Sequence, residues 1–566
     1  MDHLLLIDTT RVQEYIFNSN RLRENIGASY LAAQATGPWI LECLEDVVGG
    51  HNVIDAAAEK LDPDRRYEDG LDAEVIYSGG GNAMIVFREG DEMGAFIRHY
   101  SRCLLLNAPG LQVYTADLEF DWEKTDRQKK LHKEVSHLFD EVAARAKRER
   151  LPGNPLLGVA VSAACSSTGL PAVAMAPMIQ DDPDSVYPVS AEIEAKLKAV
   201  KPRDNQKSAG LADEFLHRRL GLDLKSRYLY PSDFDDLGRS SGEQSYLAVV
   251  HADGDSIGRH IQDIGADPPL DNRGYINARR QFSDDLKRVG RAAFLATVEP
   301  LMNRLEGDSR EGDVLLHLNA FGDELGRITL AANKDESRYY LPFRPLVMAG
   351  DDLTFVCDGR LGLALTTNYL AHFRRLFENQ FTASAGVAIV KVHYPFAAAY
   401  NLADQLAGSA KSYRRDHPGL QGGCLDWYFT AGGLHGDLEQ MRGREYLVPD
   451  GWLTLRPVAL EIQTDRNLER RVWPVVRAGI DAFQDARPND QKKPQWSNRR
   501  SKVKALRDAL RGGSQATEQF IISARIGPLP EVVKKEDAFF RADGWYSGRC
   551  GYFDALELVD LFMPIR

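Results

Sequence analysis

The sequence predicts an α+β fold: two ferredoxin-like palm domains (β-α-β-β-α-β), a middle linker domain and a C-terminal helical domain. Three observations predict it. The same order of apolar strands and amphipathic helices occurs twice. Each copy contains a hairpin with a glycine in its turn. The number of residues from that turn to the next strand is the same in both copies. Gly80 to Leu111 and Gly350 to Phe381 both span 31 residues. Such an order also arises by chance in α+β chains, but turn type and spacing agree together, which favours a duplication.

The second copy is the clearer one. Short apolar runs bounded by turn residues predict a strand at 246–252, a hairpin over 345–359 and a strand at 381–390. Helical periodicity predicts helices at 361–380 and 396–415. This copy is the predicted active second palm domain, residues 245–425.

The first copy repeats that order. Strands are predicted at 4–10 and 111–120, a hairpin at 74–87, and helices within 11–45, at 91–106 and at 126–150. The resulting boundaries are a degenerate first palm domain at 1–155, a middle linker segment at 156–244, and a C-terminal helical domain at 426–566.

Composition describes an ordinary globular chain with an acidic balance. Apolar residues make up 43% of the 566 residues, charged residues 27%, and the net charge is −12. This charge argues against wholesale coating of nucleic acid, although it permits one basic groove. The six cysteines form no CxxC pair, the N-terminus lacks the features of a signal peptide, and no run of about 20 apolar residues occurs. We therefore expect a cytoplasmic protein without membrane contact.

Carboxylates gather where two neighbouring strands of the second copy should end. Asp253 follows the first strand, and Asp351 and Asp352 occupy the hairpin turn. In a palm fold these strands are adjacent, so the side chains should meet, and such a cluster is costly unless a cation neutralises it. Oxygen ligands of this kind suit Mg²⁺, with Mn²⁺ as the alternative. Two such ions, about 4 Å apart, support phosphoryl transfer.

Nucleotide-binding groups accompany these carboxylates. Gly254 and Gly258 keep the loop after Asp253 open, so that backbone N–H groups near Asp255 and Ser256 can cradle phosphates. Lys411 follows Asp404 by seven residues on the predicted helix and can reach a triphosphate. Gly350 permits close approach of a base or ribose. Asp pairs in turns are often only turn chemistry, and Asp255 alternatively faces the loop or solvent, but the combined set is more specific. Ser384 is predicted to be structural.

These motifs resemble the large polymerase subunit of type III CRISPR effector complexes. The resemblance rests on HADGDSIG, AGDDLTFVC, SAGVAI and the helix ending at Lys411 in the second copy, on LRENIGASYL and YSGGGNAMIVF in the first, and on CSSTGLPAV between them. It covers most of the chain. Members of that family carry a degenerate first palm and an active second palm, and the second is related to the GGDEF nucleotide cyclases.

The resemblance implies an enzyme that joins nucleoside triphosphates (NTP or dNTP) into a cyclic or short linear oligonucleotide second messenger, with release of pyrophosphate. Asp253, Asp351 and Asp352 would hold two metal ions. Antiviral defence, and an effector protein that responds to the product, are implied in the same way. Three features depart from the family: the turn reads AGDD instead of GGDD, no His-Asp dipeptide marks an HD nuclease, and lone Cys165 makes no zinc site. We expect activity to survive the first departure, no HD-type nuclease activity, and a buried structural thiol at Cys165.

The first copy lacks this chemistry, because Gly79-Gly80-Gly81-Asn82 replaces the AGDD turn and leaves Asp8 alone. Two other functions stay open: a catalytically silent nucleotide-binding or scaffold subunit, and a GGDEF-type dinucleotide cyclase. The sequence does not decide base, sugar or product length. It also leaves open the stimulus, the oligomeric state, and whether the chain works in a CRISPR complex or alone.

One basic segment stands out at 492–511. It contains a single acid, Asp508, and the following cations: Lys492, Lys493, Arg499, Arg500, Lys502, Lys504, Arg507 and Arg511. Val503, Leu506 and Leu510 form the opposite, apolar stripe, and Trp496 is nearby. The segment is either an RNA or protein contact or an ordinary solvated helix face.

Overall fold

The computed structural model describes residues 1–149, 161–178, 185–201, 210–224, 227–237, 245–305, 314–318, 324–333, 337–430, 436–461, 470–484, 496, 500–532 and 542–565. The chain forms two compact units. The first comprises Met1–Asp223, Ser256–Gly290 and Leu346–Asp351, and the second comprises Leu224–Asp255, Arg291–Pro345 and Asp352–Arg566. The four domain boundaries drawn from the sequence stay predictions.

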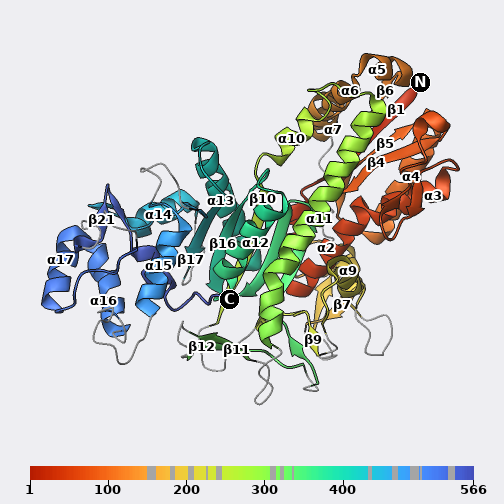
Figure 1. Cartoon of the computed structure of the whole chain (residues 1–566). Helices are drawn as coiled ribbons and strands as arrows, with labels where there is room; N and C mark the ends of the chain where they lie inside the picture. Colours follow the sequence, from red (N-terminus) through yellow and green to blue (C-terminus); the bar gives the residue numbers. More distant parts are fainter. Residues whose placement is uncertain are drawn as a thin grey trace. The chain divides into compact units, whose positions relative to one another are not determined.

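A four-stranded antiparallel sheet is the centre of the first unit (Figure 1). Its strand order is β4-β5-β1-β6, so the first strand in the sequence lies between the third and the fourth, as in a ferredoxin-like palm. The strands are β1 (Asp2–Thr10), β4 (Ala73–Gly79), β5 (Asn82–Phe87) and β6 (Gln112–Phe120).

Both faces of this sheet pack against helices. Successive side chains of β1 point to opposite sides of the sheet, so its apolar residues enter two cores. Leu5 and Ile7 enter a core with helices α3 (Pro38–Val47) and α4 (Gly90–Asn107). Leu4 and Leu6 enter a second core with α6 (Leu131–His137) and the start of α11 (Asn272–Leu305).

The predicted helix at 126–150 is interrupted. Asp121 caps α5 (Trp122–Gln128) by accepting a hydrogen bond from the Lys124 backbone, and Lys129, in left-handed conformation (φ 53°), ends the helix.

The remaining regular elements of the first unit are α1 (Val12–Phe17), α2 (Leu22–Thr36), β2 (Val53–Asp55), β3 (Lys60–Leu61), a 3₁₀ turn (Tyr67–Asp69), a π-helical turn (Leu138–Ala143), α7 (Ala144–Glu149), β7 (Ala174–Pro177), β8 (Val186–Val189), α8 (Ala191–Val200), α9 (Leu211–Leu220) and α10 (Ile257–Asp263). Cys165 is buried, as predicted.

The second unit has a six-stranded sheet whose first four strands repeat the palm order, β14-β15-β10-β16. The sequence did not predict its extension by β17, which pairs parallel with β16, and by β20. The elements of this layer are β10 (Tyr246–Gly254), β14 (Phe343–Ala349), β15 (Asp352–Asp358), α12 (Gly362–Leu376), β16 (Ala383–Lys391), α13 (Phe396–Asp416), β17 (Cys424–Phe429) and β20 (Val458–Ala459). Helices α12 and α13 pack on β10 and β16. The predicted α+β fold with two palm domains is confirmed.

The C-terminal part is mainly helical, and it also contains a four-stranded sheet of order β18-β19-β22-β21. The other elements of the second unit are β9 (Tyr228–Leu229), a 3₁₀ turn (Phe234–Asp236), β11 (Val314–Leu318), β12 (Glu324–Thr329), β13 (Tyr339–Tyr340), α14 (Leu438–Tyr446), β18 (Leu447–Val448), β19 (Gly451–Trp452), α15 (Trp473–Gln484), α16 (Arg500–Arg511), α17 (Gly513–Ser523), β21 (Trp545–Tyr546), β22 (Arg549–Cys550) and α19 (Phe553–Leu558).

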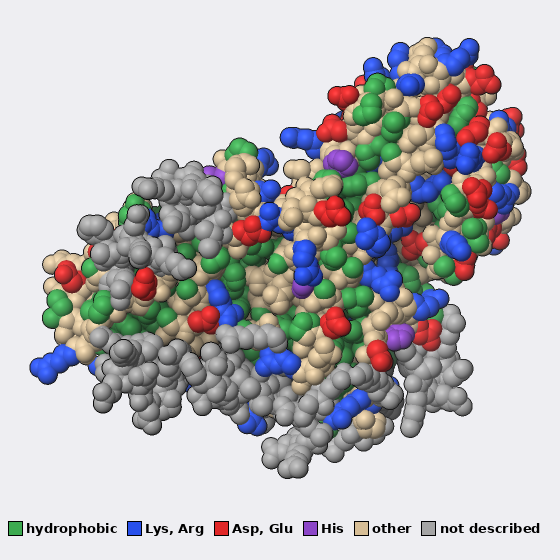
Figure 2. Space-filling model, in the orientation of Figure 1, with side chains coloured by type: hydrophobic (Ala, Val, Ile, Leu, Met, Phe, Trp, Pro, Cys, Tyr) green, Lys and Arg blue, Asp and Glu red, His purple; other side chains and the backbone are tan. Residues whose placement is uncertain are grey.

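Charges of both signs are mixed on the surface of the first unit. In Figure 2, Asp and Glu side chains lie among the Lys and Arg side chains on the face in view. This mixture agrees with the argument from net charge against wholesale nucleic-acid coating. None of the helices in the described ranges combines the length and the apolar composition needed to span a lipid bilayer.

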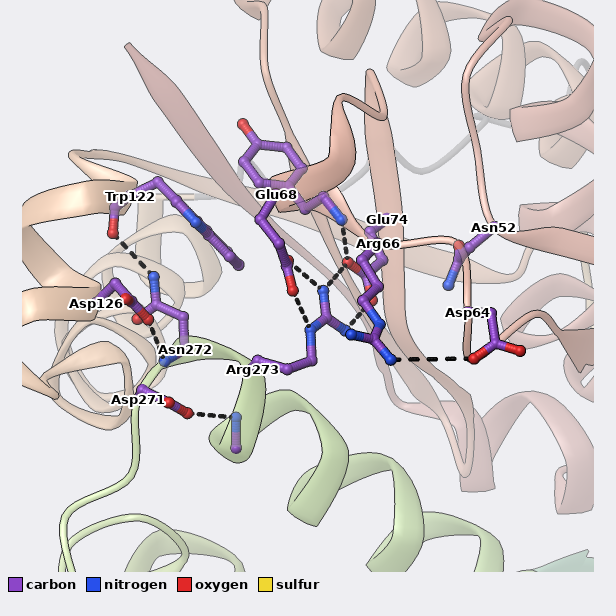
Figure 3. A network of polar contacts seen from close by, with 12 residues as sticks. Asn52, Asp64, Arg66, Glu68, Glu74, Trp122, Asp126, Asp271, Asn272 and Arg273 are labelled. Atoms are coloured by element: carbon purple, nitrogen blue, oxygen red, sulfur yellow. Dashed lines mark hydrogen bonds and ion pairs between the residues drawn. The ribbon is translucent and has the colours of Figure 1, made fainter.

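The first 19 residues of α11 belong to the first unit and are fixed to it by polar contacts (Figure 3). Asp271 caps the helix by accepting a hydrogen bond from the Gly274 backbone (2.7 Å), and the Asn272 side chain donates to the Trp122 carbonyl (2.9 Å). Arg273 forms ion pairs with Glu68 and with fully buried Glu74, each at 2.7 Å. These contacts hold the first turns of the helix against the first palm.

Candidate active site in the second palm

The two predicted carboxylates Asp253 and Asp352 lie at the same end of adjacent strands. β10 and β15 are antiparallel, with Ala252 opposite Leu353, so the next pair in that register is Asp253 and Asp352. Directly opposite residues share a face of a sheet. Their side chains are 36% and 35% exposed, so both are reachable from solvent. Asp351 directly precedes Asp352 in the turn.

A buried histidine lies beside these carboxylates. The His251 imidazole is 6% exposed, and its Nδ1 hydrogen-bonds with the Thr354 hydroxyl (3.1 Å) and lies 3.5 Å from Asp352 Oδ1. Its Nε2 lies 3.6 Å from Asp404 Oδ1 on α13. His251 is thus close to carboxylates of two different elements.

Lys411 on α13 forms an ion pair with Asp253, 158 residues earlier in the chain. The sequence predicted Lys411 as a phosphate ligand near this group, and the structure brings its ammonium to the carboxylate. The side chain is 32% exposed. An ammonium on a flexible stem, partly open to solvent, is able to exchange one anionic partner for another.

Asp255 is committed to contacts within the chain. It accepts hydrogen bonds from the hydroxyls of Thr382 (2.7 Å) and Ser384 (2.8 Å), and Arg414 Nε lies 3.3 Å away. Its side chain is only 8% exposed. This geometry favours a role in positioning the end of β10, and it gives no support to the predicted nucleotide-binding role. Ser384 is structural in these contacts, in line with the prediction.

The predicted phosphate-loop residues differ in conformation. Gly254 is the last residue of β10 and pairs with Ala383, whereas Ser256 has a left-handed backbone (φ 64°) directly before α10. A side chain on Gly258 would meet no atom within 4 Å. In the hairpin turn, Gly350 has φ 71°, which favours glycine, while Ala349 is the last residue of strand β14. The alanine of the AGDD turn is therefore compatible with the backbone.

Burial and charge oppose each other around His251. Burial lowers the pKa of His251, and the neighbouring carboxylates of Asp404 and Asp253 raise it in part. Burial also raises the pKa of the Tyr400 phenol, and Asp352, Asp404 and Asp253 add to that rise. Burial raises the pKa of Asp255, although the Thr382 and Ser384 hydroxyls counteract it. The site therefore combines buried His251 and Asp255 with the carboxylates of Asp253 and Asp352, which stay reachable from solvent.

The donor set fits Mg²⁺ or Mn²⁺ delivered with a nucleotide. Across the described parts of the chain, no three His, Cys, Asp or Glu side chains are already gathered in an arrangement that would hold a metal ion unaided. Mg²⁺ is commonly bound by one or two carboxylates together with waters and substrate phosphates. The adjacent oxygen donors of Asp253 and Asp352 match that mode of binding.

The equivalent positions of the first palm carry different chemistry. By register, Asp8 opposes Asn82 on β5, as Asp253 opposes Asp352. The Asp8 carboxylate accepts hydrogen bonds from the Tyr114 hydroxyl (2.6 Å) and from the Thr9 backbone (2.9 Å). Three successive glycines with positive φ, Gly79, Gly80 and Gly81, form the turn. The prediction of a degenerate turn agrees with this geometry.

The basic segment is largely engaged inside the chain where it is described. Residues 492–495 and 497–499 lie outside the described residues. On α16 the apolar stripe is buried, as predicted. Arg500 pairs with Asp560 (2.5 Å), Lys502 donates to the Ala524 carbonyl (2.7 Å), and Arg511 donates to the Glu445 carbonyl (2.8 Å). These contacts, and the burial of Trp496, favour a structural helix face; the RNA or protein contact stays a prediction.

The strand order and the register of the second sheet define a palm-domain protein. Residues 246–418 match the family described as Cas10/Cmr2, second palm domain. Residues 246–418 are therefore similar to that family, and the resemblance predicted from the sequence is confirmed. No curated protein is similar to it in sequence.

Solved Csm1 structures share the fold. A Csm1–Csm4 cassette in complex with cA4 is 13% identical, with a TM-score of 0.51, and covers 100% of this chain and 70% of its own. Csm1 in T. onnurineus is 12% identical, with a TM-score of 0.50 and the same coverage. A Csm1–Csm4 cassette in complex with pppApA is 12% identical, with a TM-score of 0.50, and covers 99% and 69%. At these identities the likeness concerns the fold.

His251 and Asp404 are the site residues that sequence reasoning missed. Their signals were present: His251 precedes Asp253 by two residues and so shares its face of the strand, and Asp404 precedes Lys411 by two helical turns. The sequence does not show that His251 is buried beside α13. Its contact with Asp404 depends on how that helix packs on the sheet.

Proposed function

We propose that this chain is a metal-dependent nucleotidyltransferase that joins nucleoside triphosphates into a short linear or cyclic oligonucleotide at its second palm. The observation that carries the proposal is the placement of Asp253 and Asp352 side by side on adjacent strands, with Lys411 in contact with Asp253. Solved Csm1–Csm4 cassettes in complex with cA3 and cA4 support the proposal by their shared fold.

The residues divide the work as follows. Asp253, Asp351 and Asp352 would hold Mg²⁺, which when bound neutralises phosphate charge and favours in-line attack. Lys411 exchanges its contact with Asp253 for the triphosphate and holds it as a point charge. The 3′-hydroxyl of one nucleotide attacks the α-phosphorus of the next, and pyrophosphate leaves. Asp255, fixed by Thr382, Ser384 and Arg414, positions the end of the Asp253 strand. Catalysis is then mainly orientation and charge stabilisation.

The test is direct synthesis. Purified protein is incubated with each NTP and dNTP and with Mg²⁺ or Mn²⁺, with and without candidate RNA activators, and the products are resolved by mass spectrometry. We expect an oligonucleotide, and pyrophosphate in an amount equimolar to the bonds formed. Product length separates a longer oligonucleotide from the product of a GGDEF-type dinucleotide cyclase. Absence of product under all conditions would favour the silent nucleotide-binding or scaffold subunit.

A paired variant tests the site. Asp351→Ala combined with Asp352→Ala should abolish synthesis while the protein stays folded by circular dichroism. Synthesis that persists in this variant would show that the carboxylates are wrongly assigned. The role in antiviral defence, and the effector that reads the product, are part of the same proposal; phage challenge of cells that carry either the unaltered protein or the paired variant tests them.

A further inference from the structure

The hairpin segment Leu346–Asp351 contacts two helices of the first unit, α2 and α11. It belongs to the first compact unit, together with the first palm and residues 256–290. Ser29 on α2 donates a hydrogen bond from its hydroxyl to the Leu346 carbonyl. On α11, Leu286 Cβ would lie 3.5 Å from a Cβ on Gly350, an ordinary packing distance.

The closest approach is between two glycines. A Cβ built on Gly290 of α11 would lie 2.1 Å from the carbonyl oxygen of Gly350. Cβ atoms do not come this close to a backbone oxygen. The Gly350 oxygen is part of the backbone, so it cannot move away as the end of a flexible side chain could. Only glycine therefore lets α11 lie directly against the turn that carries Asp351.

The same helix is anchored along the first palm by three cations at intervals of seven residues, and so on one face. Arg273 pairs with Glu74 (2.7 Å), Arg280 pairs with Glu74 (2.9 Å) and donates to the Val75 carbonyl (2.8 Å), and Lys287 donates to the Ser78 carbonyl (2.6 Å). Figure 3 shows the first of these anchors. The acceptors Glu74, Val75 and Ser78 lie along β4, which is an edge strand of its sheet. The helix is therefore attached to the strand at successive points.

We propose that α11 is a brace that fixes the backbone of the turn segment Leu346–Asp351 against the first palm, with Gly290 as the positioning residue where brace and turn meet. The first palm then has a role of its own, because its unit fixes the backbone of Asp351, one of the proposed metal-binding carboxylates. The activity readout below rests on the proposed function, and the exchange readout does not.

The experiment compares three variants of the full chain by hydrogen–deuterium exchange and by kinetics. Gly290→Ala should speed exchange in peptides covering 346–351, while peptides from β10 exchange as in the unaltered protein. It should lower kcat by about 10²-fold, the typical cost of misplacing a reacting group, with little change in nucleotide KM. Gly443→Ala, also within a helix but with no atom within 4 Å of the added Cβ, is the matched control and should change neither readout.

Arg273→Gln is a second variant, which disturbs the brace far from the turn, and circular dichroism and urea unfolding must first show that both variants are folded. Arg273 lies 17 residues from Gly290, about 26 Å along the helix, so an effect on exchange at 346–351 must travel through the brace. We expect faster exchange there, smaller than in Gly290→Ala. Unchanged exchange at 346–351 in both variants would overturn the proposal. If the unaltered protein makes no oligonucleotide, the proposed function fails, and the exchange result alone still decides about the brace.

Discussion

The two palms have the same strand order and a corresponding register, but they differ at two of the three positions that the proposed chemistry uses. Where the second palm has Asp253, Asp351 and Asp352, the first has Asp8, Gly81 and Asn82. The one shared carboxylate is also held differently: Asp253 contacts the Lys411 ammonium, whereas Asp8 accepts hydrogen bonds from neutral donors. The comparison teaches that buried strand faces maintain the same palm in both copies, while a few residues at the strand ends give the two copies different charge.

The strongest test of this comparison is the same substitution in both palms. Asp253→Asn should lower synthesis by about 10²- to 10³-fold, because an electrostatic group of the site is lost. Asp8→Asn, its register equivalent, should leave kcat/KM within about twofold, since it lies outside the catalytic site. Steady-state kinetics of both variants measure the difference. Equal losses in the two variants would contradict the assignment of chemistry to the second palm.

The second test concerns a carboxylate that serves the fold. Glu74 is fully buried and pairs with both Arg273 and Arg280, so Glu74→Gln removes the charge that both guanidinium groups face. Removal of one partner from a buried ion pair costs about 3–5 kcal/mol. Urea unfolding, followed by hydrogen exchange in β4 and β5, measures this loss. The control is Glu68→Gln, at a 35% exposed partner of Arg273, which should cost less than about 1 kcal/mol. Similar losses in both variants would mean that burial of Glu74 adds nothing.

The third test separates binding from chemistry at Lys411. Lys411→Gln removes the charge-assisted contact that we propose to the triphosphate, so the nucleotide KM should rise about 10- to 100-fold. Arg415→Gln, an exposed cation of the same helix, should leave KM unchanged. Initial rates over a range of nucleotide concentrations provide both values. An unaltered nucleotide KM in the Lys411 variant would show that this lysine does not bind the nucleotide.

The smallest expected effect is a pH dependence in the first palm. Burial raises the pKa of Asp8, although Tyr114 and Thr9 counteract it. Ionised Asp8 therefore costs folding free energy at neutral pH, and the cost fades as pH falls through the folded pKa toward the ordinary value near 3.8. Asp8→Asn should stabilise the protein at pH 7, by less than about 1 kcal/mol, and this advantage should shrink toward pH 4. Thermal unfolding at both pH values checks it, with exposed Asp117→Asn as control. An advantage that grows at pH 4 would reverse the sign and contradict the burial argument.

Local patterns predicted the palm elements well. The turn glycines Gly80 and Gly350 are both in positive-φ turns between paired strands, and β16 follows the second turn where the spacing placed it. These features depend on residues close together in the sequence, where strand alternation and turn chemistry act. The helix expected at 126–150 is interrupted because Lys129 adopts a left-handed backbone, which composition does not reveal, and it resumes at Leu131 and continues to Glu149.

Features that depend on packing were not predictable. The apolar run 424–429 reads as a strand in retrospect, but its parallel pairing with β16 depends on the connection through α13. Asp255 was predicted to bind nucleotide as part of the loop after Asp253, yet Thr382, Ser384 and Arg414 engage its carboxylate. His251 and Asp404 are 153 residues apart and meet only when α13 packs on the sheet.

The triple-glycine turn of the first palm also constrains how the two copies can change with time. Asn82 is a single substitution away from aspartate, but Gly81, which corresponds to Asp351, has φ 95°, and Gly79 has φ 106°. Both angles lie beyond the left-handed region that side chains tolerate. A carboxylate at position 81 would first require the turn to change its conformation. Single substitutions therefore lead to this glycine turn more readily than they lead from it to a turn with two carboxylates.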